Sequence, residues 1–262
     1  MRTISTRCSL VLRISDGFTG RPPSPSAIGV SLLGQTRKPI AKPGGLWVFT
    51  DLDGLEVTVI VASAQFIEQK LRIRLDELSS LEPVVPIALL PGPAYPLPTG
   101  TTVLEALIRD RAGNLLIDER VDADITLPQT ARGRLVAGAA AGMNEIEVMK
   151  SGVISPGDWY RISGRDQAAS GQLVRILELR DGVRQYRTAN PLLAQTTRGD
   201  LLLPHMKSAT DGRGRLRLVL GQPLPNEAFE IFLSFPDRED QTPIGITLKP
   251  SVLNQADICL EV

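Results

Sequence analysis

The sequence predicts an all-β protein with more than one domain, and two observations support this fold class. Glycine (23 residues) and proline (20 residues) together make about one residue in six, a content typical of strand-and-turn folds. Short segments alternate apolar and polar residues, which is the pattern of strands with one buried face. Hydrophobic residues make up 42% and charged residues 22% of the 262-residue chain, so it is expected to fold around real cores.

Residues 1–90 are predicted to form a first β-sandwich. Its clearest strand is Lys70–Leu75, in which the basic residues share one face and the apolar residues share the other. No convincing helix interrupts the short strands. The remaining strands and turns follow in order: Leu10–Ile14, the turn Asp16–Gly20, Ile28–Leu32, Leu46–Phe49, the turn Asp51–Gly54 and Glu56–Ala62.

Residues 91–100 are predicted to be a linker, because four prolines fall between Pro91 and Pro98 and favour an extended, semi-rigid chain. The first strand pattern then returns in two parts, 101–129 and 207–262, which are expected to form a second, discontinuous β-sandwich. Residues 130–206 between these parts are predicted to be an inserted domain, a five-stranded barrel or curled sheet. The simplest interpretation is two copies of one sandwich in tandem, the second interrupted by the insertion.

Charge and cysteine content exclude several partners. Lys and Arg equal Asp and Glu at 29 each, so no net positive charge favours nucleic acid. No apolar run is long enough for a membrane span, and no secretory signal is expected. The two cysteines, Cys8 and Cys259, lie near opposite ends of the sequence, and they could form a disulfide because the termini of a domain are often close in space. The alternative expectation is two isolated buried thiols. They cannot make a zinc site of the usual ligand count.

The residues that could carry chemistry are few. His205 is the single histidine and lies beside Leu203, Pro204 and Met206, without a nucleophile motif, so a structural imidazole at a strand end is expected. Asp51 and Asp53 resemble the start of a calcium loop, but Ala62 occupies the position of its last ligand. No phosphate-binding glycine loop is present. The sequence therefore predicts no catalytic residue, metal or cofactor.

Three groups of residues are candidates for a protein interface. Two basic stripes lie on the exposed faces of predicted strands, where they are either simply solvated or docked on an acidic neighbour. An aromatic pair after a turn is either an exposed anchor or part of a core. The three groups are Lys70, Arg72 and Arg74; Arg213, Arg215 and Arg217; and Trp159 and Tyr160.

The segments Arg13–Pro22 and Gly45–Leu52 resemble the carboxypeptidase regulatory-like family, which has a transthyretin-like β-sandwich. The linker and the turns at Asp110–Gly113 and Thr210–Gly214 are similar to a second copy. In this two-copy arrangement the chain resembles proteins encoded with phage-tail-like contractile injection systems, over about two-thirds of its length, outside the insertion. The family name describes a domain that accompanies a peptidase, so the resemblance implies no catalytic residue.

The resemblance implies a non-enzymatic structural or adaptor subunit at the cap or baseplate of such a particle. Its expected partners are other subunits of a large symmetric assembly, sheath, tube or baseplate proteins, with several copies of this chain per particle. Assembly is expected in the cytoplasm, and an extracellular location after particle release stays open. The alternative is a carbohydrate- or surface-binding adhesin module in which Trp159 and Tyr160 stack on sugars. An enzyme ranks third.

Overall fold

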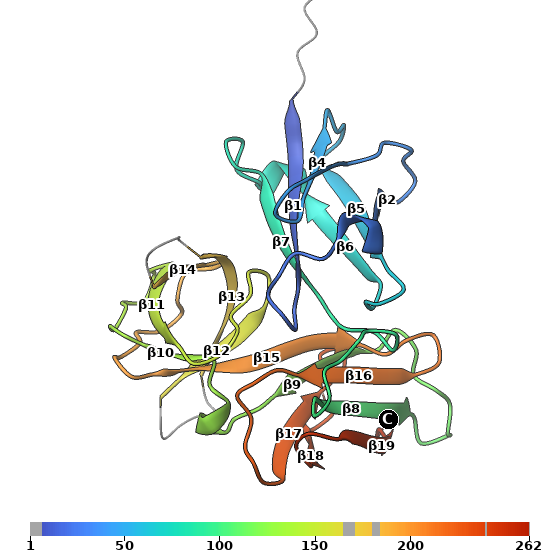
Figure 1. Cartoon of the computed structure of the whole chain (residues 1–262), viewed down its shortest axis with the longest axis vertical. Helices are drawn as coiled ribbons and strands as arrows, with labels where there is room; N and C mark the ends of the chain where they lie inside the picture. Colours follow the sequence, from blue (N-terminus) through green and yellow to red (C-terminus); the bar gives the residue numbers. More distant parts are fainter. Residues whose placement is uncertain (1–6, 165–170, 180–183, 239, 262) are drawn as a thin grey trace, which may run out of the picture. The chain divides into compact units, whose positions relative to one another are not determined.

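A computed structural model describes residues 7–164, 171–179, 184–238 and 240–261. The chain divides into two compact units, one formed by Met1–Pro96 with Ser155–Gly157 and the other by Leu97–Ile154 with Asp158–Val262. Among the described residues the regular elements are nineteen strands and three single 3-10 turns, Pro25–Ala27, Leu75–Glu77 and Pro128–Thr130 (Figure 1). The predicted all-β fold class is confirmed.

The first unit contains two sheets that enclose one apolar core. Leu10, Leu12 and Ile14 alternate along one sheet and are buried against Val57 and Val59 of the other. One sheet has the order β3-β4-β1-β7 and the other β2-β5-β6. The bounds are β1 (Cys8–Asp16), β2 (Gly29–Leu32), β3 (Ile40–Lys42), β4 (Leu46–Thr50), β5 (Glu56–Ala62), β6 (Gln69–Arg74) and β7 (Val84–Leu89).

The start of the proline-rich segment packs on the first sandwich, so the first compact unit extends beyond residue 90. The Tyr95 hydroxyl donates a hydrogen bond of 2.5 Å to Asp16 Oδ2. The Tyr95 ring also contacts Phe18 and Phe66, at ring-centre distances of 6.1 and 5.3 Å. An aromatic side chain therefore fixes the first half of the predicted linker, 91–100, to the sandwich.

The second unit repeats this pattern of pairing. In the sheet β16-β8-β19 the central strand is antiparallel to β16 and parallel to β19, as β1 is to β4 and β7. The strands β9, β17 and β18 are paired antiparallel in the same order as β2, β5 and β6. The bounds are β8 (Thr102–Arg109), β9 (Arg120–Asp124), β16 (Arg215–Leu220), β17 (Phe229–Ser234), β18 (Ile244–Leu248) and β19 (Leu253–Cys259).

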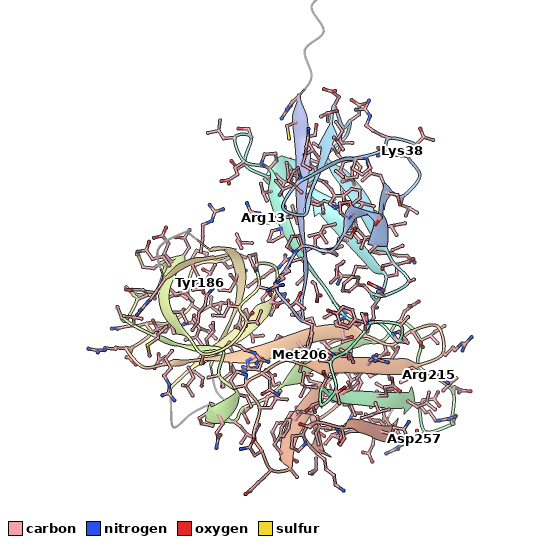
Figure 2. All side chains as sticks on the ribbon, viewed as in Figure 1. Arg13, Lys38, Tyr186, Met206, Arg215 and Asp257 are labelled. Carbon is pink, nitrogen blue, oxygen red and sulfur yellow. The ribbon has the colours of Figure 1, made fainter. Side chains whose placement is uncertain are left out.

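A closed six-stranded barrel stands between β9 and β16 in the sequence. Its strand order is β10-β11-β14-β13-β12-β15, and pairing of β10 with β15 closes the ring. The barrel has its own apolar core, which includes Tyr186 at 1% exposure (Figure 2). The bounds are β10 (Gly133–Leu135), β11 (Glu145–Lys150), β12 (Trp159–Ser163), β13 (Gln172–Leu179), β14 (Gln185–Thr188) and β15 (Leu201–Ala209).

Strand β15 belongs to both the barrel and the second sandwich. Its first residues pair with β10, and His205–Ala209 pair with β9. The backbone of Leu202 faces β10, since its carbonyl oxygen accepts from Arg132 N at 2.7 Å, and Pro204 faces the same edge two residues later. Pro204 lies between the residues of β15 that pair with β10 and those that pair with β9, so its missing N–H breaks no hydrogen bond to either strand. The expected five-strand count is therefore wrong, and β15 crosses the predicted boundary at 206/207.

Candidate functional site

A group of charged and titratable side chains in mutual contact lies where β15 passes from the barrel to the sandwich. Asp122 and Asp124 alternate on β9, and His205 and Lys207 alternate on β15. In the antiparallel register His205 lies opposite Asp124 and Lys207 lies opposite Asp122, so each basic residue faces an acidic one. Arg161, from β12 on the other side of β15, approaches Asp124.

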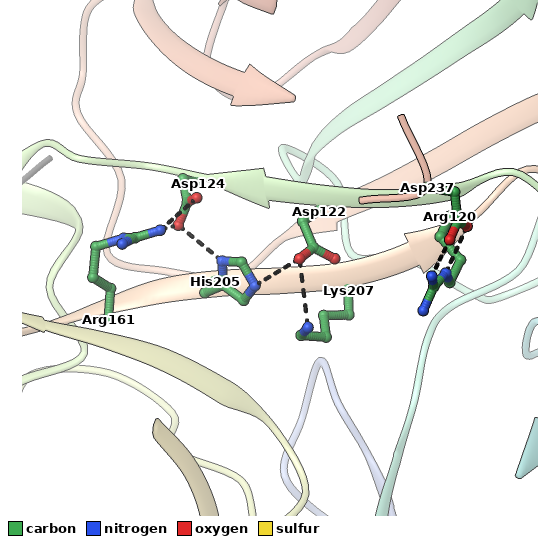
Figure 3. A network of polar contacts seen from close by, with 7 residues as sticks. All are labelled: Arg120, Asp122, Asp124, Arg161, His205, Lys207 and Asp237. Atoms are coloured by element: carbon green, nitrogen blue, oxygen red, sulfur yellow. Dashed lines mark hydrogen bonds and ion pairs between the residues drawn. The ribbon is translucent and has the colours of Figure 1, made fainter. Parts of the chain in front are cut away.

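Both ring nitrogens of His205 contact carboxylates (Figure 3). Nδ1 lies 2.9 Å from Asp124 Oδ1, a hydrogen-bond distance. Nε2 lies 3.4 Å from Asp122 Oδ2, an ion-pair distance without hydrogen-bond geometry. Arg161 donates to both oxygens of Asp124, at 3.3 and 2.9 Å, and Lys207 Nζ lies 3.4 Å from Asp122 Oδ2. These five residues are called the His205 network below.

Burial and charge act in opposite directions on the titration of this network. The side chain of His205 is 2% exposed. Its burial alone would lower its pKa, but Asp122 and Asp124 together outweigh burial and raise the pKa of His205 above its ordinary value. Burial would likewise raise the pKa of each aspartate, but the neighbouring cations lower the pKa of Asp122 and of Asp124.

The geometry suits a structural connection between two parts of the second unit. A histidine acting as a general base needs a ring nitrogen that faces a substrate, whereas both nitrogens of His205 face carboxylates and the ring is buried. The imidazole was expected at a strand end and lies inside β15. His205 joins β15, the strand that the barrel and the sandwich share, to β9 of the sandwich.

The basic stripe of the first unit is exposed but already paired with acidic residues. Lys70, Arg72 and Arg74 alternate on the outer face of β6. Lys70 pairs with Glu68 at 3.4 Å, Arg72 with Glu56 at 2.5 Å and Arg74 with Asp76 at 2.6 Å. The pairs reduce the positive charge that this face presents to a neighbour.

The second stripe is not a continuous line of free cations. Arg213 lies in the turn before β16, where its backbone N–H donates to Asp211 Oδ1 at 2.8 Å. Arg215 begins β16 and is exposed (Figure 2). Arg217 is half-buried and donates to Glu105, its direct cross-strand partner on β8, at 2.6 Å.

The aromatic pair is divided between two environments. Tyr160 is buried at 3% exposure in the barrel core, so it offers no exposed ring. Trp159 is half-buried, and Lys207 Nζ lies 4.6 Å from its ring centre, a cation–π contact. The alternation of β12 separates the two side chains, because neighbours in a strand point to opposite faces.

Both cysteines are free thiols, and both are exposed. The expectation of buried thiols is therefore wrong, because Cys8 and Cys259 occupy outward-facing positions at the ends of β1 and β19.

Sequence reasoning missed most of the His205 network. The alternation of Asp122 with Asp124 and of His205 with Lys207 is visible in the sequence, but only the pairing of β9 with β15 brings them together. Another missed residue is Arg132, which is buried and donates to the carbonyl oxygen of Gly221 at 2.8 Å. Burial lowers the pKa of Arg132.

Comparison with known proteins adds little to this picture. No family model and no curated protein matches the chain. One solved structure, that of the Streptococcal ancillary pilin, aligns with 98% of this chain and 99% of its own, at 10% identity and a TM-score of 0.20. This similarity is too weak to indicate a shared fold. In the part of the chain that the structure describes, no helix could cross a membrane and no cluster of His, Cys, Asp or Glu suits a metal ion.

Proposed function

We propose that this chain is a non-enzymatic structural or adaptor subunit of a phage-tail-like contractile injection particle, at its cap or baseplate. The observation that supports the proposal best is the recurrence of one strand order in the two units. The proposal rests on the sequence resemblance for its biological setting and on strand pairing for its architecture.

The architecture belonging to this proposal is a tandem of two transthyretin-like sandwiches. In it, β1, β2, β4, β5, β6 and β7 correspond to β8, β9, β16, β17, β18 and β19. The barrel is then an insertion between the second and the next equivalent strand of the second copy. An insertion at a loop between strands leaves the sandwich pairing intact, which is why this division is physically reasonable.

The surfaces offered to other subunits are the outer faces and the edges of the sheets. β6 presents Lys70, Arg72 and Arg74 together with their acidic partners, and β16 presents Arg215 at its start. A partner for β6 would need both charge signs, because a purely acidic surface would repel Glu56 and Glu68. We propose that such contacts hold the chain among sheath, tube or baseplate proteins of a particle assembled in the cytoplasm.

Affinity purification of the tagged full-length protein from its own organism tests this proposal. Mass spectrometry should identify sheath and tube proteins in the eluate, and negative-stain images should show rods. The matched control is the same tagged strain without expression of the particle genes. Recovery of the protein alone, while the particle genes are expressed, would refute the assembly role. Glycan-array binding through Trp159 would instead support the adhesin alternative.

A further inference from the structure

The two sandwiches differ at two equivalent edges. β3 covers β4 in the first unit, whereas β16, its counterpart in the second unit, pairs with β8 alone among the described strands. The edges of β9 and β2 differ in the opposite sense. In the second unit the outer edge of β9 is covered by β15, which adds five residues, His205–Ala209, in antiparallel register. In the first unit β2 occupies the same place beside β5, and within the described ranges it pairs with β5 alone. The edge that an antiparallel strand covers in one sandwich is therefore open in the other.

The backbone of β2 has hydrogen-bonding groups on this open edge. Leu33 N donates to the carbonyl oxygen of Thr58 at 2.9 Å. The backbone N–H and C=O groups of every second residue, Gly29, Ser31 and Leu33, therefore face β5. Val30 and Leu32 then face away from β5. The Leu32 carbonyl oxygen accepts from Gln35 N, at 3.3 Å, which leaves the N–H and C=O of Val30 and the N–H of Leu32 on the open edge.

Charge distinguishes this edge from the opposite edge of the same sheet. The exposed residues of β2 are Gly29, which has no side chain, and Ser31, which carries no charge, and Leu33 next to the strand is 61% exposed. The opposite edge strand, β6, carries alternating Lys and Arg, a feature that prevents strand-to-strand association. Two copies of β6 would have to match their Lys and Arg side chains and the acidic partners Glu56 and Glu68, whereas two copies of β2 bring no outward charge that has to be matched.

We propose that β2 pairs antiparallel with β2 of a second copy of this chain about a twofold axis. A strand can pair with its own copy in this way because an antiparallel ladder is self-complementary under twofold symmetry. The groups on the open edges of the two β2 strands then bond to each other. The inference does not depend on the injection particle, since it uses only the edge geometry of the first sandwich.

Sedimentation of the full-length protein in reducing buffer tests the pairing. A four-residue edge makes a small interface, so the concentration series should extend to about 1 mM, where weak association becomes visible. The wild-type protein should form dimers. Val30→Pro removes the outward N–H without removing a bond to β5, and it should raise the dimer dissociation constant at least tenfold, by an order-of-magnitude estimate.

Arg72→Pro is the matched control. Leu75 N donates to the carbonyl oxygen of Leu55 at 2.7 Å, so the N–H of Arg72 faces away from β5 on the opposite edge. This variant should dimerise like the wild type. Because Val30 is half-buried, Ser31→Lys is the second test variant; it places a cation on the open edge and should also weaken dimers.

Two results would overturn the inference. If the wild-type protein stayed monomeric through the whole concentration series, β2 would not pair with a second copy of this chain. Dimers that persist in both folded variants, Val30→Pro and Ser31→Lys, would place the interface elsewhere on the chain.

Discussion

At the scale of residues, the single histidine shows what the sequence could and could not predict. Its lack of a neighbouring nucleophile predicted a structural setting, because chain neighbours are visible in the sequence. Its partners Asp122 and Asp124 lie 83 and 81 positions away and approach it only through pairing of β9 with β15. Cross-strand contacts between distant segments depend on register, which a single sequence does not determine.

Replacing His205 by Gln tests the energetic role of the network. The variant leaves Asp122 and Asp124 without the cation that lies between them, and it should lower the free energy of unfolding by about 2–4 kcal/mol. Urea denaturation at pH 6 measures the change. Arg120→Ala, which breaks the exposed pair with Asp237 beside the network, is the control and should have a much smaller effect (Figure 3). Equal effects would contradict a special role for His205.

The titration of His205 gives a second prediction. Its pKa should exceed the ordinary value of 6.5, and NMR can follow it directly because the chain contains one histidine. A folded-state pKa above the unfolded value stabilises the protein below pH 6.5, and this contribution is lost as the pH rises through the folded-state pKa. Asp124→Asn should lower the pKa of His205. An unchanged pKa in this variant would contradict the contact.

Asp122 and Asp124 determine the low pH at which the His205 network stops stabilising the fold. The pKa values of Asp122 and Asp124 lie below their ordinary value of 3.8. Their stabilising contribution is therefore present above pH 3.8 and is lost as the pH falls through their folded-state pKa values. The stability difference between wild type and His205→Gln should thus be largest between these limits, from 3.8 to 6.5.

At the scale of elements, alternation predicted most strands, but it did not predict their ends. Strands such as β5 and β6 follow the period-two pattern closely, and their bounds agree with the sequence prediction to within a residue. The predicted boundary at 206/207 falls inside strand β15, because the prediction placed the return of the sandwich pattern after residue 206. Within β15 the partner strand changes while the strand continues.

Gly133 tests how tightly the barrel is closed. A Cβ atom at this position, in β10, would lie 2.4 Å from Val148 Cγ1 and 2.8 Å from the Met149 carbonyl oxygen. Gly133→Ala should therefore destabilise the second unit by about 1–3 kcal/mol and increase amide exchange in β10 and β15. In the control, Gly212→Ala, the added Cβ meets no atom within 4 Å. Unchanged exchange in the Gly133 variant would show that the closure of the barrel adapts.

At the scale of the whole molecule, a repeat was predicted from turns and strand spacing, and two sets of three strands are paired in the same order in both units. The order β4-β1-β7 recurs as β16-β8-β19 and β2-β5-β6 recurs as β9-β17-β18, although an inserted barrel separates β9 from β16 and β3 has no counterpart among the described strands. The sequence could not predict that the last barrel strand would cover the edge of the sandwich. That arrangement depends on how one nine-residue strand divides its length between two sheets.

The shared strand leads to a last prediction, that the barrel and the second sandwich unfold as one unit. β15 cannot leave the barrel while it keeps its full pairing with β9, because both ladders belong to one continuous strand. Ile176→Ala in the barrel core should cost about 2–5 kcal/mol and should weaken amide protection in both the barrel and β16–β19. Leu218→Ala in the sandwich core should do the same from the other side.

Hydrogen exchange followed by mass spectrometry measures both variants. The control is Leu12→Ala, in a sandwich that shares no strand with the barrel. It should weaken protection of β1–β7. If Ile176→Ala reduced protection only in β10–β14, the two ladders of β15 would be energetically separable, and the barrel would be an independent domain despite its continuous strand. Loss of protection on both sides of His205 would instead show that β15 couples them.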